Sequence, residues 1–93
     1  MTFESGDFVV YYQNDIPMHA LVVQQFQTYH YNKYKLDTYI VSPCEGLFKY
    51  IRIKGEDLTL VKLSTEQKLF ILTSFGKSWF CNNKQLFTKA MQK

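Results

Sequence analysis

Residues able to act as nucleophiles or as general acids and bases are few in this chain and lie far apart. The histidines and cysteines are His19, His30, Cys44 and Cys81, accompanied by scattered carboxylates. Catalysis requires a nucleophile and its base, or an acid and a base, held within hydrogen-bond reach. Cys44 and His30 could meet across loops, but no recognisable catalytic motif contains either. We therefore predict that the protein is not an enzyme.

Patterns that bind metals or phosphate groups are also missing from the sequence. The two cysteines are widely separated, and neither belongs to a Cys-x-x-Cys pair or a Cys/His cluster of the kind that binds zinc. The 4 glycines are isolated at expected turns and form no phosphate-binding loop. We expect no metal and no cofactor, and we expect Cys44 and Cys81 to be free thiols.

Aromatic side chains are plentiful, with 7 Tyr, 8 Phe and 1 Trp in 93 residues. Many of the tyrosines fall in expected loops, where a ring with an apolar body and a polar hydroxyl suits a protein interface. Packing on the rim of a small domain is the alternative role for the same rings. The predicted partner-binding residues are Tyr29, Tyr31, Tyr34, Phe48, Tyr50 and Arg52.

Charge is distributed unevenly behind a net charge of +3. All 11 Lys and Arg residues lie after residue 32, whereas the acids Glu4, Asp7 and Asp15 lie before it. Basic residues interleaved with aromatic ones can contact phosphates and stack on bases. Nucleic-acid binding is therefore the alternative function, and a solvated basic surface is the alternative to both. The predicted nucleic-acid contacts are Lys33, Lys35, Lys49, Arg52 and Lys54.

Five short apolar runs separated by turn signals must position these residues. Alternation of side chains and β-forming residues predicts strands over 7–12, 19–27, 36–42, 47–54 and 58–63. Both faces of the first strand are mostly apolar, with Phe8 on one and Val9 on the other. We expect a turn at 14–17, a polar and aromatic hairpin tip at 29–35 and a compact turn at 54–57.

Helices are predicted only after residue 63. Ser64 and Gln67 have the spacing of a capping box, which predicts a helix over 65–75 with Leu69, Leu72 and Phe75 on its apolar stripe. Asn82 or Asn83 caps a final helix that ends near residue 92. Its apolar stripe packs on the strands or, alternatively, on another protein, and consists of Leu86, Phe87, Ala90 and Met91.

The pattern Gly-Asp-x-Val-x-Tyr over 6–11, followed by three further strands and Leu-x-Leu-Val over 58–61, resembles SH3-like or Tudor-type small β-barrels. The resemblance covers residues 6–63 and implies a long first loop and a 3₁₀ turn near residue 55. Tudor relatives would suggest an aromatic cage for methylated lysine. The abundance of Lys, Asn, Tyr, Phe and Ile also resembles small proteins of phages or low-GC bacteria.

These observations predict one α+β domain over residues 1–93, with a five-stranded SH3-like barrel at 6–63 and a helical extension at 64–93 packed on it. The first seven residues contain no base, and no apolar run reaches membrane-spanning length. We expect a cytoplasmic protein without a signal peptide or membrane anchor. Its predicted function is that of a small non-enzymatic binding module, regulatory or host-directed, that engages another protein.

Overall fold

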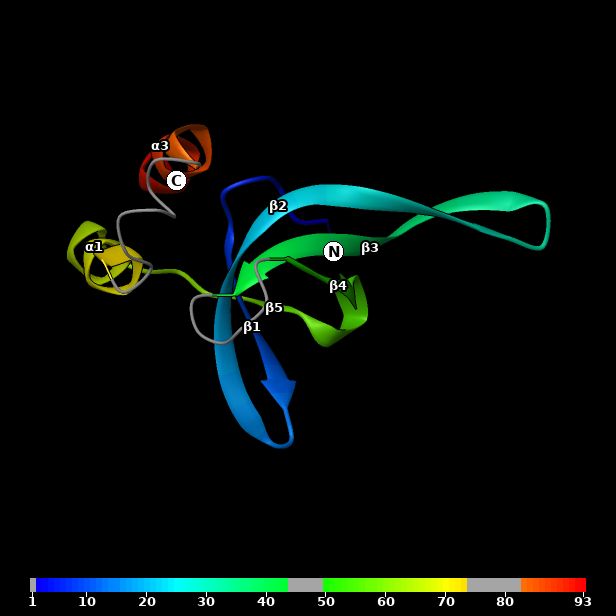
Figure 1. The fold of residues 1–93 in the computed structure, drawn as a ribbon, viewed down its shortest axis with the longest axis horizontal. Helices are drawn as coiled ribbons and strands as arrows, with labels where there is room; N and C mark the ends of the chain where they lie inside the picture. The colour runs from blue at the N-terminus through cyan, green and yellow to red at the C-terminus, as the bar shows by residue number, and fades with distance from the viewer. Residues whose placement is uncertain (1, 44–49, 74–82) are drawn as a thin grey trace.

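One antiparallel sheet and two α-helices make up the described part of the chain, which in this computed structural model comprises residues 2–43, 50–73 and 83–93 (Figure 1). The predicted α+β class is confirmed. The strands are β1 (Phe8–Gln13), β2 (Ile16–His30), β3 (Lys33–Pro43), β4 (Ile51–Lys54) and β5 (Thr59–Leu60). The helices are the 3₁₀ turn η1 (Gly55–Asp57), α1 (Thr65–Thr73) and α3 (Lys84–Met91).

The strand order β4-β3-β2-β1-β5 makes the two edge strands consecutive in the chain. Four strand spacings would separate the edges of a flat sheet by about 19 Å. The five residue steps from Lys54 to Thr59 span at most about 17 Å when extended, and the 3₁₀ turn shortens this link further. The sheet must therefore curl. Within the described residues β4 and β5 form no ladder with each other, so the curled sheet is open rather than a closed barrel.

Both long hairpins turn on two residues with positive φ. Asn14 and Asp15 have φ of 52° and 64°, and Tyr31 and Asn32 have φ of 50° and 60°. Asn and Asp tolerate this left-handed region, so each chain reversal is immediate. The long first loop implied by the family resemblance is therefore wrong, and Pro17 lies within β2 opposite Tyr12.

The central strands are longer than predicted, whereas β5 is shorter. The expected polar tip at 29–35 is largely strand, because β2 and β3 continue their ladder as far as the pair His30 and Lys33. Two register shifts allow the ladder to bend: the extra residue lies in β2 between Val22 and Gln24, and in β3 between Lys35 and Thr38. Of the predicted fourth strand, residues 47–49 lie outside the described residues. The compact turn at 54–57 is confirmed as η1.

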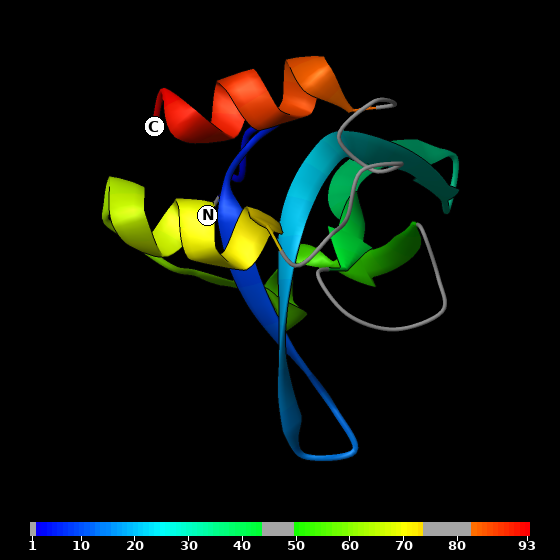
Figure 2. The ribbon, with the colours of Figure 1, turned by 60° about the vertical axis from the view of Figure 1, so that its left-hand side comes forward.

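The part of the first hairpin away from its turn is buried on both faces, as its alternation predicts, whereas Tyr12 and Ile16 next to the turn are exposed. Val9, Ala20 and Val22 join one core with Tyr39 and other residues of the concave side. Their neighbours in the strands point the opposite way and join a second core beneath the helices, built from Phe8, Leu21, Leu72, Leu86 and Ala90. Figure 2 shows α1 and α3 lying together over this part of the sheet.

The predicted capping box starts α1. The Ser64 amide donates to Gln67 Oε1 at 2.9 Å, and the Gln67 amide donates to Ser64 Oγ at 3.2 Å. The predicted apolar stripe is confirmed for Leu72, which is buried, but is wrong for Leu69, which is 42% exposed while Lys68 is buried beside Leu72. The aliphatic stem of Lys68 can be buried because its ammonium group donates to the backbone oxygen of Lys93. Phe75 lies outside the described residues.

The apolar stripe of α3 packs on its own chain. Leu86 and Ala90 are buried, and Phe87 and Met91 pack around them in the second core. Asn83 precedes the helix but does not cap it with its side chain. Packing on the sheet, rather than docking on another protein, is therefore the role of this stripe.

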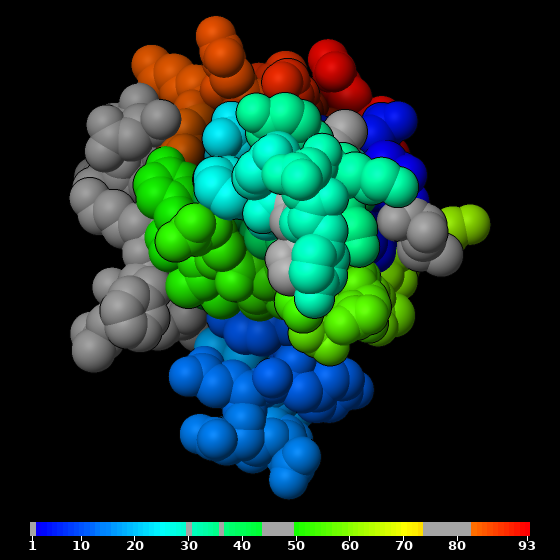
Figure 3. All heavy atoms as spheres, turned by 90° about the vertical axis from the view of Figure 1, so that its right-hand side faces the viewer, coloured from blue at the N-terminus to red at the C-terminus, as the bar shows by residue number. Residues whose placement is uncertain are grey.

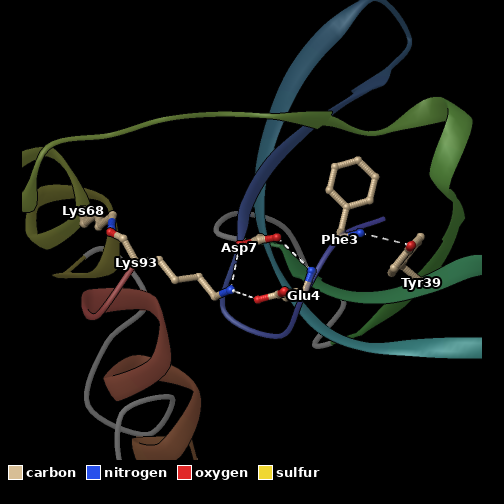
Figure 4. A network of polar contacts seen from close by, with 6 residues as sticks. All are labelled: Phe3, Glu4, Asp7, Tyr39, Lys68 and Lys93. Carbon is tan, nitrogen blue, oxygen red and sulfur yellow. Dashed lines mark hydrogen bonds and ion pairs between the residues drawn. The ribbon is translucent and has the colours of Figure 1, made fainter. Parts of the chain in front are cut away.

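The N-terminal segment is held by polar contacts to both halves of the structure (Figure 4). Lys93 Nζ lies 2.7 Å from Glu4 Oε2 and 3.1 Å from Asp7 Oδ1. The hydrogen bond to Glu4, followed by the contacts to Asp7, raises the pKa of Lys93. On the other side, the amide of Phe3 donates to the hydroxyl of Tyr39 at 3.1 Å. These contacts join the N-terminal segment to the end of α3 and to β3.

Candidate functional site

The most prominent surface feature is the projecting end of the β2–β3 ladder. β4 pairs with β3 only from Thr38 to Val41, so the preceding part of β3 extends beyond it. We call residues 28–37 the hairpin. It extends away from the helices in Figure 1, and Figure 3 shows its side chains standing in front of the sheet when the molecule is viewed onto the tip.

One face of the hairpin presents tyrosines. Tyr29 and Tyr34 are directly opposite each other, with ring centres 4.9 Å apart and ring planes inclined by 53°. The Tyr29 hydroxyl donates to Asn32 Oδ1 in the turn at 2.9 Å. Although 61% and 69% exposed, the two rings are thus supported by each other and by the turn. Tyr31 occupies the adjacent turn and is 86% exposed; we call Tyr29, Tyr31 and Tyr34 together the tyrosine face.

The opposite face of the hairpin carries the lysines. Thr28 pairs with Lys35, and Lys33 lies two residues away, so both lysines point away from the tyrosine face. Thr28 Oγ1 donates to Asp37 Oδ1 at 3.0 Å, and this bond is the main reason that the pKa of Asp37 lies below its ordinary value. We call this the basic face, with two cations near the tip and one carboxylate at the base.

Two other predicted partner-binding residues lie away from the tip of the hairpin. Arg52 places its guanidinium group 5.0 Å from the centre of the Phe26 ring, a cation–π contact. The Tyr50 hydroxyl donates to Asn83 Oδ1 at 3.3 Å, next to α3. Phe48 lies outside the described residues. The structure therefore brings together three of the six predicted residues, Tyr29, Tyr31 and Tyr34.

The four described residues of the predicted nucleic-acid contacts lie on one face of the sheet. Arg52 and Lys54 pair with Ile40 and Thr38. β3 has one extra residue relative to β2 between Lys35 and Thr38, so Lys35 falls on the same face as Thr38 although one number is odd and the other even. Lys49 lies outside the described residues. Lys33, Lys35, Arg52 and Lys54 therefore share the face opposite to Tyr29 and Tyr34.

Sequence reasoning missed the residues that support the hairpin. Asn32 holds the turn through its backbone conformation and accepts the hydrogen bond from Tyr29. Thr28 and Asp37 lock the base of the basic face. The adjacent polar residues Tyr31-Asn32 between two alternating segments were the available signal, because Asn is favoured where a two-residue turn needs positive φ.

The residues considered for catalysis do not assemble into a site in the described part of the chain. His19 is half-buried and lines a groove with Leu63, Glu66 and Phe70. Cys44 and Cys81 lie outside the described residues, and the side chain of His30 is not described either. Within 2–43, 50–73 and 83–93, no three His, Cys, Asp or Glu residues are placed to hold a metal ion.

No helix among the described residues is both long and apolar enough to cross a bilayer. Comparison with protein-family models, with curated proteins and with solved structures finds no match to this chain.

Proposed function

We propose that the protein is a small, non-enzymatic binding module that engages another protein through the tyrosine face of its hairpin. The observation that carries this proposal is the cluster of three highly exposed tyrosines on a projecting ribbon. Tyrosine provides a large contact area, restricts only two side-chain torsions on binding and is enriched among residues that dominate binding energy. The mutual packing of Tyr29 and Tyr34 lowers the cost of ordering them further.

The convex shape of the hairpin favours insertion into a concave surface of the partner. Its turn contains only Tyr31 and Asn32, and the hydrogen bond from Tyr29 to Asn32 stiffens the tip. A short, preordered projection loses little conformational freedom when it enters a cleft. Arg52 would lie at the edge of such a contact, because it packs on Phe26 close to the base of the hairpin, whereas Tyr50 contacts Asn83 beside α3 and would lie outside it.

We also propose that the curled sheet belongs to the SH3-like class. Support comes from its strand order, in which the first strand lies between β2 and the short last strand, and from the 3₁₀ turn that links β4 to β5. Such small sheets serve many unrelated functions, so this assignment bears on architecture and not on the choice of partner.

Affinity capture from a lysate of the cells that produce the protein tests the proposed function. The bait is the full chain, used unchanged or with the triple change Tyr29→Ser, Tyr31→Ser and Tyr34→Ser. Tyr12→Ser is the matched control, because Tyr12 is 67% exposed but lies on the other hairpin. We expect the triple variant to lose specific protein partners and the control to keep them. Equal capture by all three baits would refute the proposal.

Nucleic-acid binding is the second candidate, supported by Lys33 and Lys35 beside exposed tyrosine rings. It predicts binding of short DNA or RNA that weakens steeply with salt, because phosphate contacts release counterions. Lys33, Lys35, Arg52 and Lys54 share one face, but Tyr29 and Tyr34 lie on the other, so the cations and the rings do not form one surface, which favours the protein partner. Captured proteins that persist after nuclease treatment, together with no binding of short DNA or RNA at low salt, would exclude the second candidate.

A further inference from the structure

The outer edge of β3 has no neighbouring strand over residues 33–36 within the described structure. β2 pairs with one side of this segment, but β4 begins to pair with the other side only at Thr38. After β4 the chain enters η1, which lies against β3 at Asp37, because a Cβ atom on Gly55 would be 3.5 Å from the Asp37 backbone oxygen. The open edge therefore ends at Asp37. Backbone groups along such an edge can accept an added strand.

The side chains along this edge alternate in charge and polarity. Lys33 and Lys35 lie on the basic face, whereas Tyr34 lies on the tyrosine face. All three are exposed. A strand added next to them would place residues directly opposite each, about 5 Å away. Acidic residues opposite the lysines and an apolar residue opposite Tyr34 would complement the edge.

We propose that residues 33–36 of β3 bind an extended segment of a partner protein as an added strand in which acidic residues alternate with apolar ones. This inference rests on the proposed function, and it specifies how the partner is held. Backbone hydrogen bonds to the edge would supply affinity. The lysines and Tyr34 would select the sequence of the added strand.

Lys33 and Lys35 also disfavour the pairing of this open β3 edge with the same edge of a second copy of the chain. Antiparallel pairing of two such edges would bring Lys33 and Lys35 of each copy close to those of the other, and like charges across strands are destabilising. The neighbouring β4 edge is also guarded, by the exposed residues Arg52 and Lys54. Charge therefore favours an acidic partner segment over self-association.

A peptide titration followed by amide NMR shifts of the full chain tests this binding mode. The probe is a blocked seven-residue peptide in which Glu alternates with Val, and the controls are the same design with Lys for Glu and the same peptide methylated at every backbone nitrogen. We expect the Glu/Val peptide to shift amides of residues 33–36 and of Tyr29, and both controls to leave them unchanged.

Matched variants test the charge complementarity. The double variant Lys33→Gln and Lys35→Gln should bind the Glu/Val peptide about tenfold more weakly, because two opposite-charge pairs across the strands are lost. The control is Lys84→Gln with Lys89→Gln, which removes two exposed lysines from α3. Equal weakening in both double variants would overturn the charge argument.

The remaining outcomes are equally decisive. Binding of the methylated peptide, shifts confined to another edge, or no shift up to the solubility limit of the Glu/Val peptide would overturn strand addition. Shifts of residues 33–36 on raising the protein concentration alone would assign the edge to a second copy. If strand addition fails while the tyrosine variant still loses its partners in the capture experiment, only the binding mode is wrong. If both fail, the proposed function is wrong as well.

Discussion

Replacing Gly6 with alanine should strongly destabilise the protein, because Gly6 is where the first strand meets α3. Its φ is +92°, a conformation that residues with a Cβ atom rarely adopt. A Cβ atom at this position would lie 2.9 Å from Lys89 Cβ and 3.0 Å from both the Lys89 carbonyl carbon and the Ala90 amide nitrogen. Two of these three atoms are helix backbone, so α3 as a whole would have to move.

The expected loss follows from two separate costs. Holding alanine at this φ costs about 1–3 kcal/mol, and overpacking against a helix costs about another 1–3 kcal/mol. The sum is about 2–6 kcal/mol, set against a total stability of about 5–14 kcal/mol for a domain of this length.

Urea unfolding followed by far-UV circular dichroism would measure this loss. Gly55→Ala is the matched control, since Gly55 does not have a positive φ and its added Cβ would first meet a ring atom of Tyr39 at 3.0 Å. We expect the control to lose about 1 kcal/mol, because only a small ring adjustment is required. A loss below about 1 kcal/mol for Gly6→Ala, or equal losses for the two variants, would refute the reasoning.

Two further changes test the contacts of the N-terminal segment. Tyr39→Phe removes the buried acceptor of the Phe3 amide and should cost about 1–3 kcal/mol in urea unfolding; an unchanged midpoint would contradict this hydrogen bond. Lys93→Met removes the ion pairs with Glu4 and Asp7 and should cost about 0.5 kcal/mol at neutral pH, a small value because these groups are partly exposed. Since the folded pKa of Lys93 is raised, its contribution is complete below the ordinary lysine value of 10.5 and is lost as pH rises through the folded pKa. The two proteins should therefore converge in stability at high pH, and a difference that persists there would contradict the ion-pair assignment.

Local signals predicted the element types well but not their lengths. The Ser64–Gln67 box starts α1 because both of its hydrogen bonds are short-range and encoded by two residues. The extension of β2 to His30 depends instead on its partner strand. Residues near the tip are polar and resemble a loop in the sequence, but they form a strand because His30 pairs with Lys33.

Tertiary packing decided the points at which sequence reasoning was wrong. Leu72 is buried as predicted, but apolar residues occur around α1, so periodicity did not reveal that Leu69 would be 42% exposed and Phe70 81% exposed. The burial of Lys68 depends on the backbone oxygen of Lys93, a contact across 25 positions that no local pattern encodes. Long-range geometry of this kind is set by the fold as a whole.

The tyrosine cluster was predictable as a group of residues but not as a surface. Tyr29, Tyr31 and Tyr34 were selected for their type, whereas the register that faces Tyr29 toward Tyr34 depends on the bulge near Phe26. The same bulge places Lys33 on the face of Arg52, which strict alternation along β3 would not predict. A shift of one residue in register would reverse both results.

Site-specific photocrosslinking tests the central claim, that the tyrosine face contacts a protein, most directly. A benzophenone amino acid is placed at Tyr31 in one protein and at Tyr12 in a control, since both positions are highly exposed and lie on different hairpins. After irradiation in the native lysate and nuclease treatment, the account predicts a discrete protein adduct from position 31 and none from position 12. Identical adducts from both positions, or adducts that nuclease removes, would contradict it.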